Sequence, residues 1–207
     1  MNIDFTSMQS FFTILWKMKT VERWHGKYWD DYGLARNESV PDHVWRMCMM
    51  LLYVEGKLSI KYDTFHCLKI ILVHDMPEIE TGDINAANDN SVYNDPSSKK
   101  VKEENERAAM KHILKDLEEP LRSELMDLWE EYEAWVTPEA KVAKSIDKME
   151  AFLHAYETSN AEHYPEHLAF ITKMIEGQKG RVKEFDELYE EIKQVFIREY
   201  KPFKKKS

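Results

Sequence analysis

Histidine and aspartate side chains occur at three separate points of the chain and together could bind a divalent metal ion. His43 lies near the start of one apolar helical pattern, Asp147 borders another, and His74 and Asp75 follow the apolar run at residues 70–73. A buried Asp75 carboxylate costs much free energy unless a cation or another partner compensates its charge. Mixed nitrogen and oxygen ligands from three helices favour Mn, Co, Fe, Ni or Zn over a thiolate-type structural zinc. Water bound to such an ion has a lowered pKa and can act as a nucleophile at neutral pH.

Each of these residues has a commoner explanation when it is taken alone. An isolated His43 is more often a helix N-terminal or core histidine than a ligand, and an isolated Asp147 is usually a surface or salt-bridged acid. Adjacent His and Asp residues also occur by chance in many proteins. The helical neighbours of Asp147 four residues away are Ala143 and Ala151, and such small residues leave room for an occupied site. The metal-site prediction therefore depends on the joint placement of all these residues.

Apolar spacing and capping signals predict helices throughout the chain. Ser39 is a suitable N-cap, with Pro41 in the first turn and Asp42 near the positive end of the helix dipole. Thr6 or Ser7 can cap the first helix. The predicted helices span about 5–20, 39–52, 63–75, 99–116, 119–135, 138–162 and 166–199, with long loops at 23–37 and 82–98.

These elements predict an all-α fold of about six to seven helices, because the sequence contains no strand pair and no internal repeat. We predict a single domain over residues 1–207. Its core spans about 5–162, followed by a C-terminal helix at about 166–199 and a short basic tail at 200–207.

The composition limits the classes of function. The chain of 207 residues has 43% apolar residues but only 6 Gly and 7 Pro, which suits a helical core better than a many-turned β-barrel. A net charge of −9 argues against a nucleic acid polymer as partner, because its backbone requires a basic surface. Without a signal-peptide pattern or an apolar run of the ~20 residues that span a bilayer, we expect a cytoplasmic protein that binds no membrane. Cys48 and Cys67 are expected to be buried free thiols.

Three segments around the candidate ligands resemble a known enzyme family. They are Glu38-Ser39-Val40-Pro41-Asp42-His43, then His74-Asp75-Met76-Pro77-Glu78-Ile79-Glu80-Thr81-Gly82-Asp83-Ile84, then Lys144-Ser145-Ile146-Asp147-Lys148-Met149-Glu150. In this order and spacing they closely resemble the HD-domain 5'-deoxynucleotidases, over residues 10–160 or so. The resemblance implies an all-α HD domain that uses one divalent ion to convert deoxyribonucleoside 5'-monophosphates to deoxynucleoside and phosphate.

The resemblance also implies a role for each candidate residue. The four residues that match metal ligands are His43, His74, Asp75 and Asp147. Glu78 matches the acid that orients or deprotonates the attacking water, and Asp83 matches the residue that contacts the sugar 3'-hydroxyl. Arg23 and Trp24 match a substrate-binding pair, with the Arg near the phosphate and the Trp against the sugar and base. A small nucleotide substrate and a homodimer are further implications.

Ordinary structural roles remain open for the four residues that are not matched to metal ligands. Glu78 could be an exposed acid after a helix end, and Asp83 could be only a turn residue or a helix cap. Arg23 could be a surface salt-bridge partner, and Trp24 could simply cover the core.

Two other functions also remain open from the sequence. A related HD-domain enzyme could hydrolyse dNTPs or an unusual nucleotide, and Lys27 and Arg36 are extra cations that could serve its entrance. A non-catalytic nucleotide-binding HD protein would lack a ligand or the catalytic acid, whereas all five positions are present here. The segments 25–34 and 82–98 are longer than in the bacterial members, which leaves base and sugar preference open.

Overall fold

The computed structural model describes residues 4–24, 37–83, 95–158 and 165–199, which form helices joined by turns and loops. The elements are α1 (Phe5–Trp16), the 3₁₀ helix η1 (Lys17–Thr20), α2 (Val40–Val54), α3 (Thr64–Val73), α4 (Glu78–Thr81), α6 (Pro96–Ile113), α7 (Leu121–Ala134), α8 (Pro138–Thr158), α9 (Pro165–Glu176) and α10 (Lys183–Glu199). Extended pairing among the described residues is confined to an isolated antiparallel bridge between Glu22 and Ser39. The predicted all-α class is confirmed.

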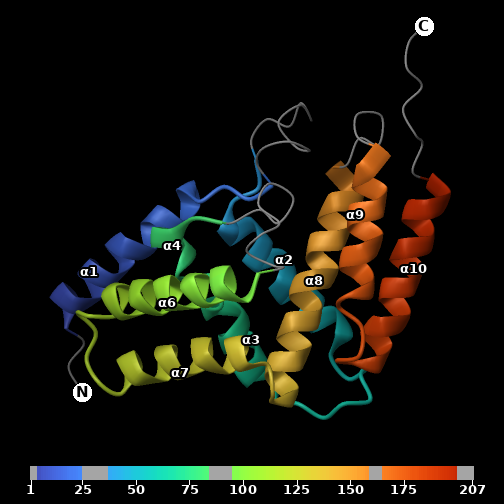
Figure 1. Ribbon diagram of the computed structural model, residues 1–207. Helices are drawn as coiled ribbons and strands as arrows, with labels where there is room; N and C mark the ends of the chain where they lie inside the picture. Colours follow the sequence, from blue (N-terminus) through green and yellow to red (C-terminus); the bar gives the residue numbers. More distant parts are fainter. Residues whose placement is uncertain (1–3, 25–36, 84–94, 159–164, 200–207) are drawn as a thin grey trace, which may run out of the picture.

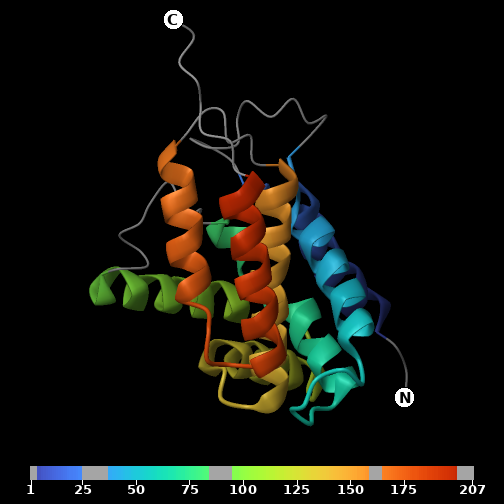
Figure 2. The ribbon, with the colours of Figure 1, turned by 90° about the vertical axis from the view of Figure 1, so that its right-hand side faces the viewer.

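Helix α8 lies at the centre of the fold. It packs against α2, α3, α7 and α10, while α9 packs against α10 and α6 lies against α4. Two views at right angles show α8, α9 and α10 side by side, with α6 running across their direction (Figures 1 and 2). Because α8 contacts both α2 and α3, side chains from all three helices can meet in one place.

The start of α2 follows the prediction from its capping signals. The Asp42 carboxylate accepts hydrogen bonds from the backbone amide of Ser39 at 2.9 Å and from its hydroxyl at 2.7 Å. Pro41 lies in the first turn, where a missing amide hydrogen costs no helical hydrogen bond. This cap places His43 in the first turn of α2, and His43 is fully buried.

The first helix begins at Phe5, as predicted, but one predicted cap and one predicted helix start were wrong. The first helix is capped by Asp4, whose carboxylate accepts a hydrogen bond from the amide of Thr6, and not by Thr6 or Ser7. Helix α6 begins at Pro96 and not near residue 99. Asp95 caps it and accepts hydrogen bonds from two amides of the first turn. In both cases an aspartate upstream of the expected start satisfies the free amides.

The predicted helix at 166–199 is two helices, α9 and α10. The chain turns between them at Gly180, whose φ of +93° lies in a region that L side chains rarely adopt. The Asp186 carboxylate accepts hydrogen bonds from the Gly180 amide at 2.9 and 3.1 Å, which holds the turn against the first turn of α10. The break lets α10 return alongside α8 and α9.

Two further sequence predictions concern membrane crossing and the cysteines. Among the described helices, none is both long and apolar enough to cross a bilayer. Cys48 and Cys67 are both free thiols, as predicted, but only Cys67 is buried. Cys48 is half-buried.

Candidate functional site

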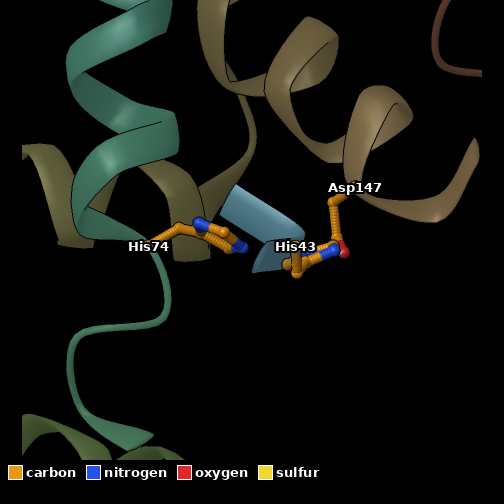
Figure 3. A group of neighbouring side chains, drawn as sticks. All are labelled: His43, His74 and Asp147. Carbon is orange, nitrogen blue, oxygen red and sulfur yellow. Dashed lines mark ion pairs between the residues drawn. The ribbon is translucent and has the colours of Figure 1, made fainter. Parts of the chain in front are cut away.

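Three helices bring two imidazoles and a carboxylate into one buried cluster. His43 comes from the first turn of α2, His74 directly follows α3, and Asp147 lies in the middle of α8. Figure 3 shows the three side chains converging from these separate elements. Their potential ligand atoms all lie within 4.8 Å of one another, and none of the three residues is more than 4% exposed.

Asp75 completes the set that the sequence predicted. One of its carboxylate oxygens lies 3.1 Å from Nε2 of His74, and the other lies 3.8 Å from Nε2 of His43. Nε2 of His43 is in turn 3.4 Å from an oxygen of Asp147. The four residues are therefore neighbours in the fold, although they come from three distant parts of the chain.

The nitrogen atoms that face this cluster lack hydrogen-bond partners. Within the described part of the chain, Nε2 of His43 and Nε2 of His74 are both buried without a hydrogen bond. The other nitrogen of each ring has a partner, because Nδ1 of His74 lies 2.8 Å from the carbonyl oxygen of Ile71 and Nδ1 of His43 lies 2.5 Å from Glu150. Two imidazole nitrogens and carboxylate oxygens that converge in a buried site are a donor set that fits a divalent cation.

The two aspartates of the cluster hold their negative charge. Burial raises the pKa of Asp147, but Lys148, whose Nζ lies 2.9 Å away, and His43 lower it to well below its usual range. Burial also raises the pKa of Asp75, but the adjacent His74 lowers it to well below its usual range. The cluster therefore presents two ionised carboxylates to whatever binds there.

A pocket of about 410 Å³ opens onto the cluster, and Glu78 and Asp83 both line it. Oε2 of Glu78 is buried and has no hydrogen-bond partner among the described residues. Burial raises the pKa of Glu78 well above its usual range, and the nearby carboxylates of Asp75 and Asp83 raise it further. A pocket carboxyl group whose pKa is shifted upward by its surroundings is a candidate for acid–base catalysis.

Arg23 and Trp24 also line the pocket and are held by a single buried acid, Glu38. The Arg23 amide donates to the Glu38 carbonyl at 2.7 Å, next to the bridge between residues 22 and 39. Oε2 of Glu38 accepts a hydrogen bond from the Trp24 indole at 2.9 Å and lies 3.5 Å from Nε of Arg23. The other oxygen, Oε1, lies 3.1 Å from Nδ1 of His154, whose ring stacks on Trp24 with centroids 5.1 Å apart.

Arg23 connects this group of side chains to the cluster, because its Nη1 donates to a carboxylate oxygen of Asp75 at 3.1 Å. Burial lowers the pKa of Arg23, but nearby carboxylates, of which Asp83 and Asp75 have the largest effect, raise it well above its usual range. The guanidinium is thus a fixed positive charge at the edge of the pocket.

Comparison with known proteins identifies the family of this chain. The model of the HD-domain family matches residues 16–190. The chain belongs to the HD-domain family. A zebrafish (Danio rerio) protein named 5'-deoxynucleotidase HDDC2 is 36% identical over 179 residues, which cover 86% of this chain and 76% of that protein. The human (Homo sapiens) protein of the same name is 37% identical over 159 residues, 77% of this chain and 72% of that protein.

A solved structure shares the HD-domain fold. The crystal structure described as a predicted metal-dependent phosphohydrolase from Magnetospirillum magnetotacticum matches with a TM-score of 0.75. It is 23% identical and covers 95% of this chain and 97% of its own. The predicted resemblance to HD-domain 5'-deoxynucleotidases is confirmed by the family model and by these relatives.

Several residues of this HD-domain site were not predicted from the sequence. The buried tyrosine Tyr132 donates a hydrogen bond to Asp147 at 2.7 Å, and Glu38, His154 and Glu150 contact the predicted residues as described. Glu150 follows Asp147 by three residues, so helical spacing was a usable signal. His154 follows Asp147 by seven residues on the same helix, so helical spacing was a usable signal for it as well. Tyr132 had no such signal, because it lies on α7 and reaches Asp147 through packing between helices.

The far wall of the pocket was also missed. Phe170 and Met174 of α9 line it together with Trp135 and Arg181, whose guanidinium carbon lies 4.2 Å from the centroid of the Trp135 ring. Phe170, Met174 and Arg181 follow the part of the chain that the family resemblance covered, whereas Trp135 lies within it. The predictions for residues 25–34, including Lys27, for Arg36 and for most of the 82–98 loop lie outside the described residues.

Proposed function

We propose that this chain is a metal-dependent phosphomonoesterase that converts deoxyribonucleoside 5'-monophosphates to deoxynucleosides and phosphate. One observation carries the proposal: four ligand-type side chains, three of them buried, lie together at a pocket that an arginine and a further carboxyl group also line. The proposed ligands are His43, His74, Asp75 and Asp147, which would hold one divalent ion, Mn, Co, Fe, Ni or Zn. The names of the relatives support the substrate class.

The chemistry follows from the positions of the protein groups. A divalent ion bound by the four ligands would polarise the phosphate and lower the pKa of water. Glu78 is the catalytic residue that accepts a proton from the attacking water. Its carboxyl group lines the pocket, and its Oε2 has no hydrogen-bond partner among the described residues. Arg23 offsets the negative charge of the phosphate oxygens, and its contacts with Asp75 and Glu38 hold it in place.

The remaining pocket residues bind the nucleoside part of the substrate. Asp83 lines the pocket near Glu78, where it would accept a hydrogen bond from the sugar 3'-hydroxyl. Trp24 supplies an aromatic face that is held between Glu38 and the ring of His154.

A dNTP hydrolase is the second candidate, because additional cations line the pocket. They are Lys99, Lys102, Lys144, Lys148 and Arg181. Four of the five pair with acids: Lys99 with Glu103, Lys102 with Glu106, Lys144 with Glu133 and Lys148 with Asp147. Since these charges are compensated within the protein, the pocket is better suited to a monophosphate than to the larger charge of a triphosphate.

The test is phosphate release from deoxy- and ribonucleoside mono- and triphosphates with Mn²⁺ or Co²⁺ added. Asp75→Ala removes a proposed ligand, and Asp127→Ala is the matched control because Asp127 is exposed on α7. We expect release from deoxynucleoside monophosphates that is lost in Asp75→Ala and kept in Asp127→Ala. Release from triphosphates alone would favour the second candidate. Metal binding without any phosphate release would favour a non-catalytic nucleotide-binding protein.

We also propose that the protein is a homodimer in the cytoplasm. Large apolar side chains are exposed on α1 and α2, including Phe5, Phe12, Trp16 and Trp45, each more than half exposed. Exposed large apolar side chains that gather on one face, as Phe5, Phe12 and Trp16 do on α1, are typical of subunit interfaces. Light scattering of the purified protein measures the subunit number, and a monomer at all concentrations would refute the dimer.

A further inference from the structure

Glu150 is a fully buried acid that the proposed reaction does not use. It lies on α8, three residues after Asp147, and therefore on nearly the same face of the helix. It does not line the pocket, so it cannot contact a substrate there. Burial of a carboxylate is costly unless close partners compensate its charge, and its position next to the ligand cluster therefore calls for an explanation.

The first partner of Glu150 is a proposed metal ligand. Oε2 of Glu150 lies 2.5 Å from Nδ1 of His43, while Nε2 of the same ring faces Asp147 and Asp75. A carboxylate can only accept a hydrogen bond, so the proton of a neutral His43 ring must be on Nδ1. The lone pair of Nε2 is then directed into the ligand cluster. Glu150 thus selects the tautomer and the ring orientation that metal binding requires.

The second partner is Arg46, one turn further along α2 from His43. Its Nε lies 3.2 Å from Oε1 of Glu150, and its Nη1 lies 2.9 Å from a carboxylate oxygen of Glu157. Glu157 follows Glu150 by seven residues on α8 and is half exposed. The four residues form a polar chain between α2 and α8 that leads from the protein surface to the cluster.

This chain is not a second metal site, although Glu38, His43 and Glu150 also have ligand-type atoms close together. The carboxylate of Glu38 already interacts with Trp24, Arg23 and His154, and that of Glu150 interacts with Arg46. Both acids are therefore compensated by protein cations and donors. Glu38 supports the substrate side of the site, and Glu150 supports the ligand side.

We propose that Glu150 is a positioning residue of the metal centre, with Arg46 as its counter-ion. Glu150 holds the His43 ring so that Nε2 faces the ion, and Arg46 keeps the charge of Glu150 in the buried interface. His74 is held in the same sense by the neutral carbonyl of Ile71. The inference rests on the metal binding proposed above. Of the two proposed histidine ligands, His43 has the charged partner, and the charge of Glu150 makes the His43 ring more basic.

The test measures Co²⁺ affinity of the metal-free protein by calorimetry, together with the visible absorption spectrum of the Co²⁺-loaded protein. Glu150→Gln keeps the shape of the side chain and removes its charge. We expect about 10- to 100-fold weaker Co²⁺ binding, the size typical of a lost partner behind a metal ligand, and a changed spectrum. Glu157→Gln is the matched control, because it removes the outer partner of Arg46 and leaves the contact with Glu150; it should bind Co²⁺ as the wild type does.

Thermal unfolding of the metal-free variants separates positioning from a purely structural role. A Glu150→Gln protein that unfolds at a lower temperature but binds Co²⁺ with unchanged affinity and spectrum would overturn the inference and leave the proposed function intact. If Glu150→Gln does not fold, Arg46→Met provides the second test, with a smaller loss of affinity expected and an unchanged affinity counting against the inference. A wild-type protein that binds no Co²⁺ would overturn both the inference and the proposed metal site.

Discussion

Replacing Glu38 by glutamine is expected to loosen the proposed substrate-binding residues Arg23 and Trp24 and to leave the four proposed metal ligands unchanged. The buried Glu38 carboxylate has donors on both oxygens, the Trp24 indole at 2.9 Å and Nδ1 of His154 at 3.1 Å. A glutamine has only one acceptor oxygen, and its NH₂ group would face one of these donors. One buried donor therefore loses its partner, and Arg23 loses the charge 3.5 Å from its Nε.

The magnitude follows from the type of hydrogen bond that is lost. A hydrogen bond to a charged group contributes about 1.5–3 kcal/mol to the free energy of unfolding. For a chain of 207 residues, a loss of this size lowers the Tm by about 3–12 °C. Because Arg23 and Trp24 are positioned through Glu38, we also expect kcat/KM for a deoxynucleoside monophosphate to fall by about tenfold or more, which corresponds to about 1.4 kcal/mol of transition-state stabilisation.

The assay combines thermal unfolding, steady-state phosphate release and Co²⁺ titration on the same preparations. Glu22→Gln is the matched control, since Glu22 lies on the same paired segment but is exposed, and its carboxylate accepts a hydrogen bond from the Asn37 side chain at 2.9 Å. It should leave all three measurements unchanged. The reasoning is refuted if Glu38→Gln keeps the Tm and kcat/KM of the wild type, or if it loses Co²⁺ affinity as strongly as Glu150→Gln.

Three further predictions concern the catalytic carboxyl group, the pocket wall and a buried thiol. Glu78→Gln should lower kcat by about 100- to 10,000-fold while the protein still binds Co²⁺, because general acid–base catalysis contributes this much; an unchanged kcat would exclude Glu78 as the proton acceptor. Phe170→Ala should raise KM by about two- to tenfold, because the substrate loses an aromatic contact. Lys173→Ala should leave KM unchanged, because Lys173 is exposed on the same helix. A Phe170→Ala protein with the KM of the wild type would show that α9 does not contact the substrate. Burial raises the pKa of the Cys67 thiol to about 12, so iodoacetamide at pH 8 should label Cys67 only after denaturation. Mass spectrometry measures the labelling, and rapid labelling of the native protein would contradict the buried position of Cys67.

Local signals in the sequence were enough for the helical class and for many of its helices. Capping at Ser39 and Asp42 depends on residues within one turn, so it can be recognised from the local sequence alone. The same locality explains the errors. Asp95 was a capping signal that was overlooked at the start of α6, and Gly180 with its positive φ was the break that was overlooked before α10.

The sequence by itself determined which residue types were available for chemistry, and the family resemblance narrowed them to one set. Only the tertiary structure decided how they meet. His43 and Glu150 are 107 positions apart, and Arg23 and Asp75 are 52 positions apart, yet each pair is within hydrogen-bonding distance. Such contacts depend on how α8 packs against α2 and α3, and that packing is set by the whole buried core. A short sequence pattern reports the helix on which a side chain lies, whereas the partner of that side chain is chosen by the packing of distant helices.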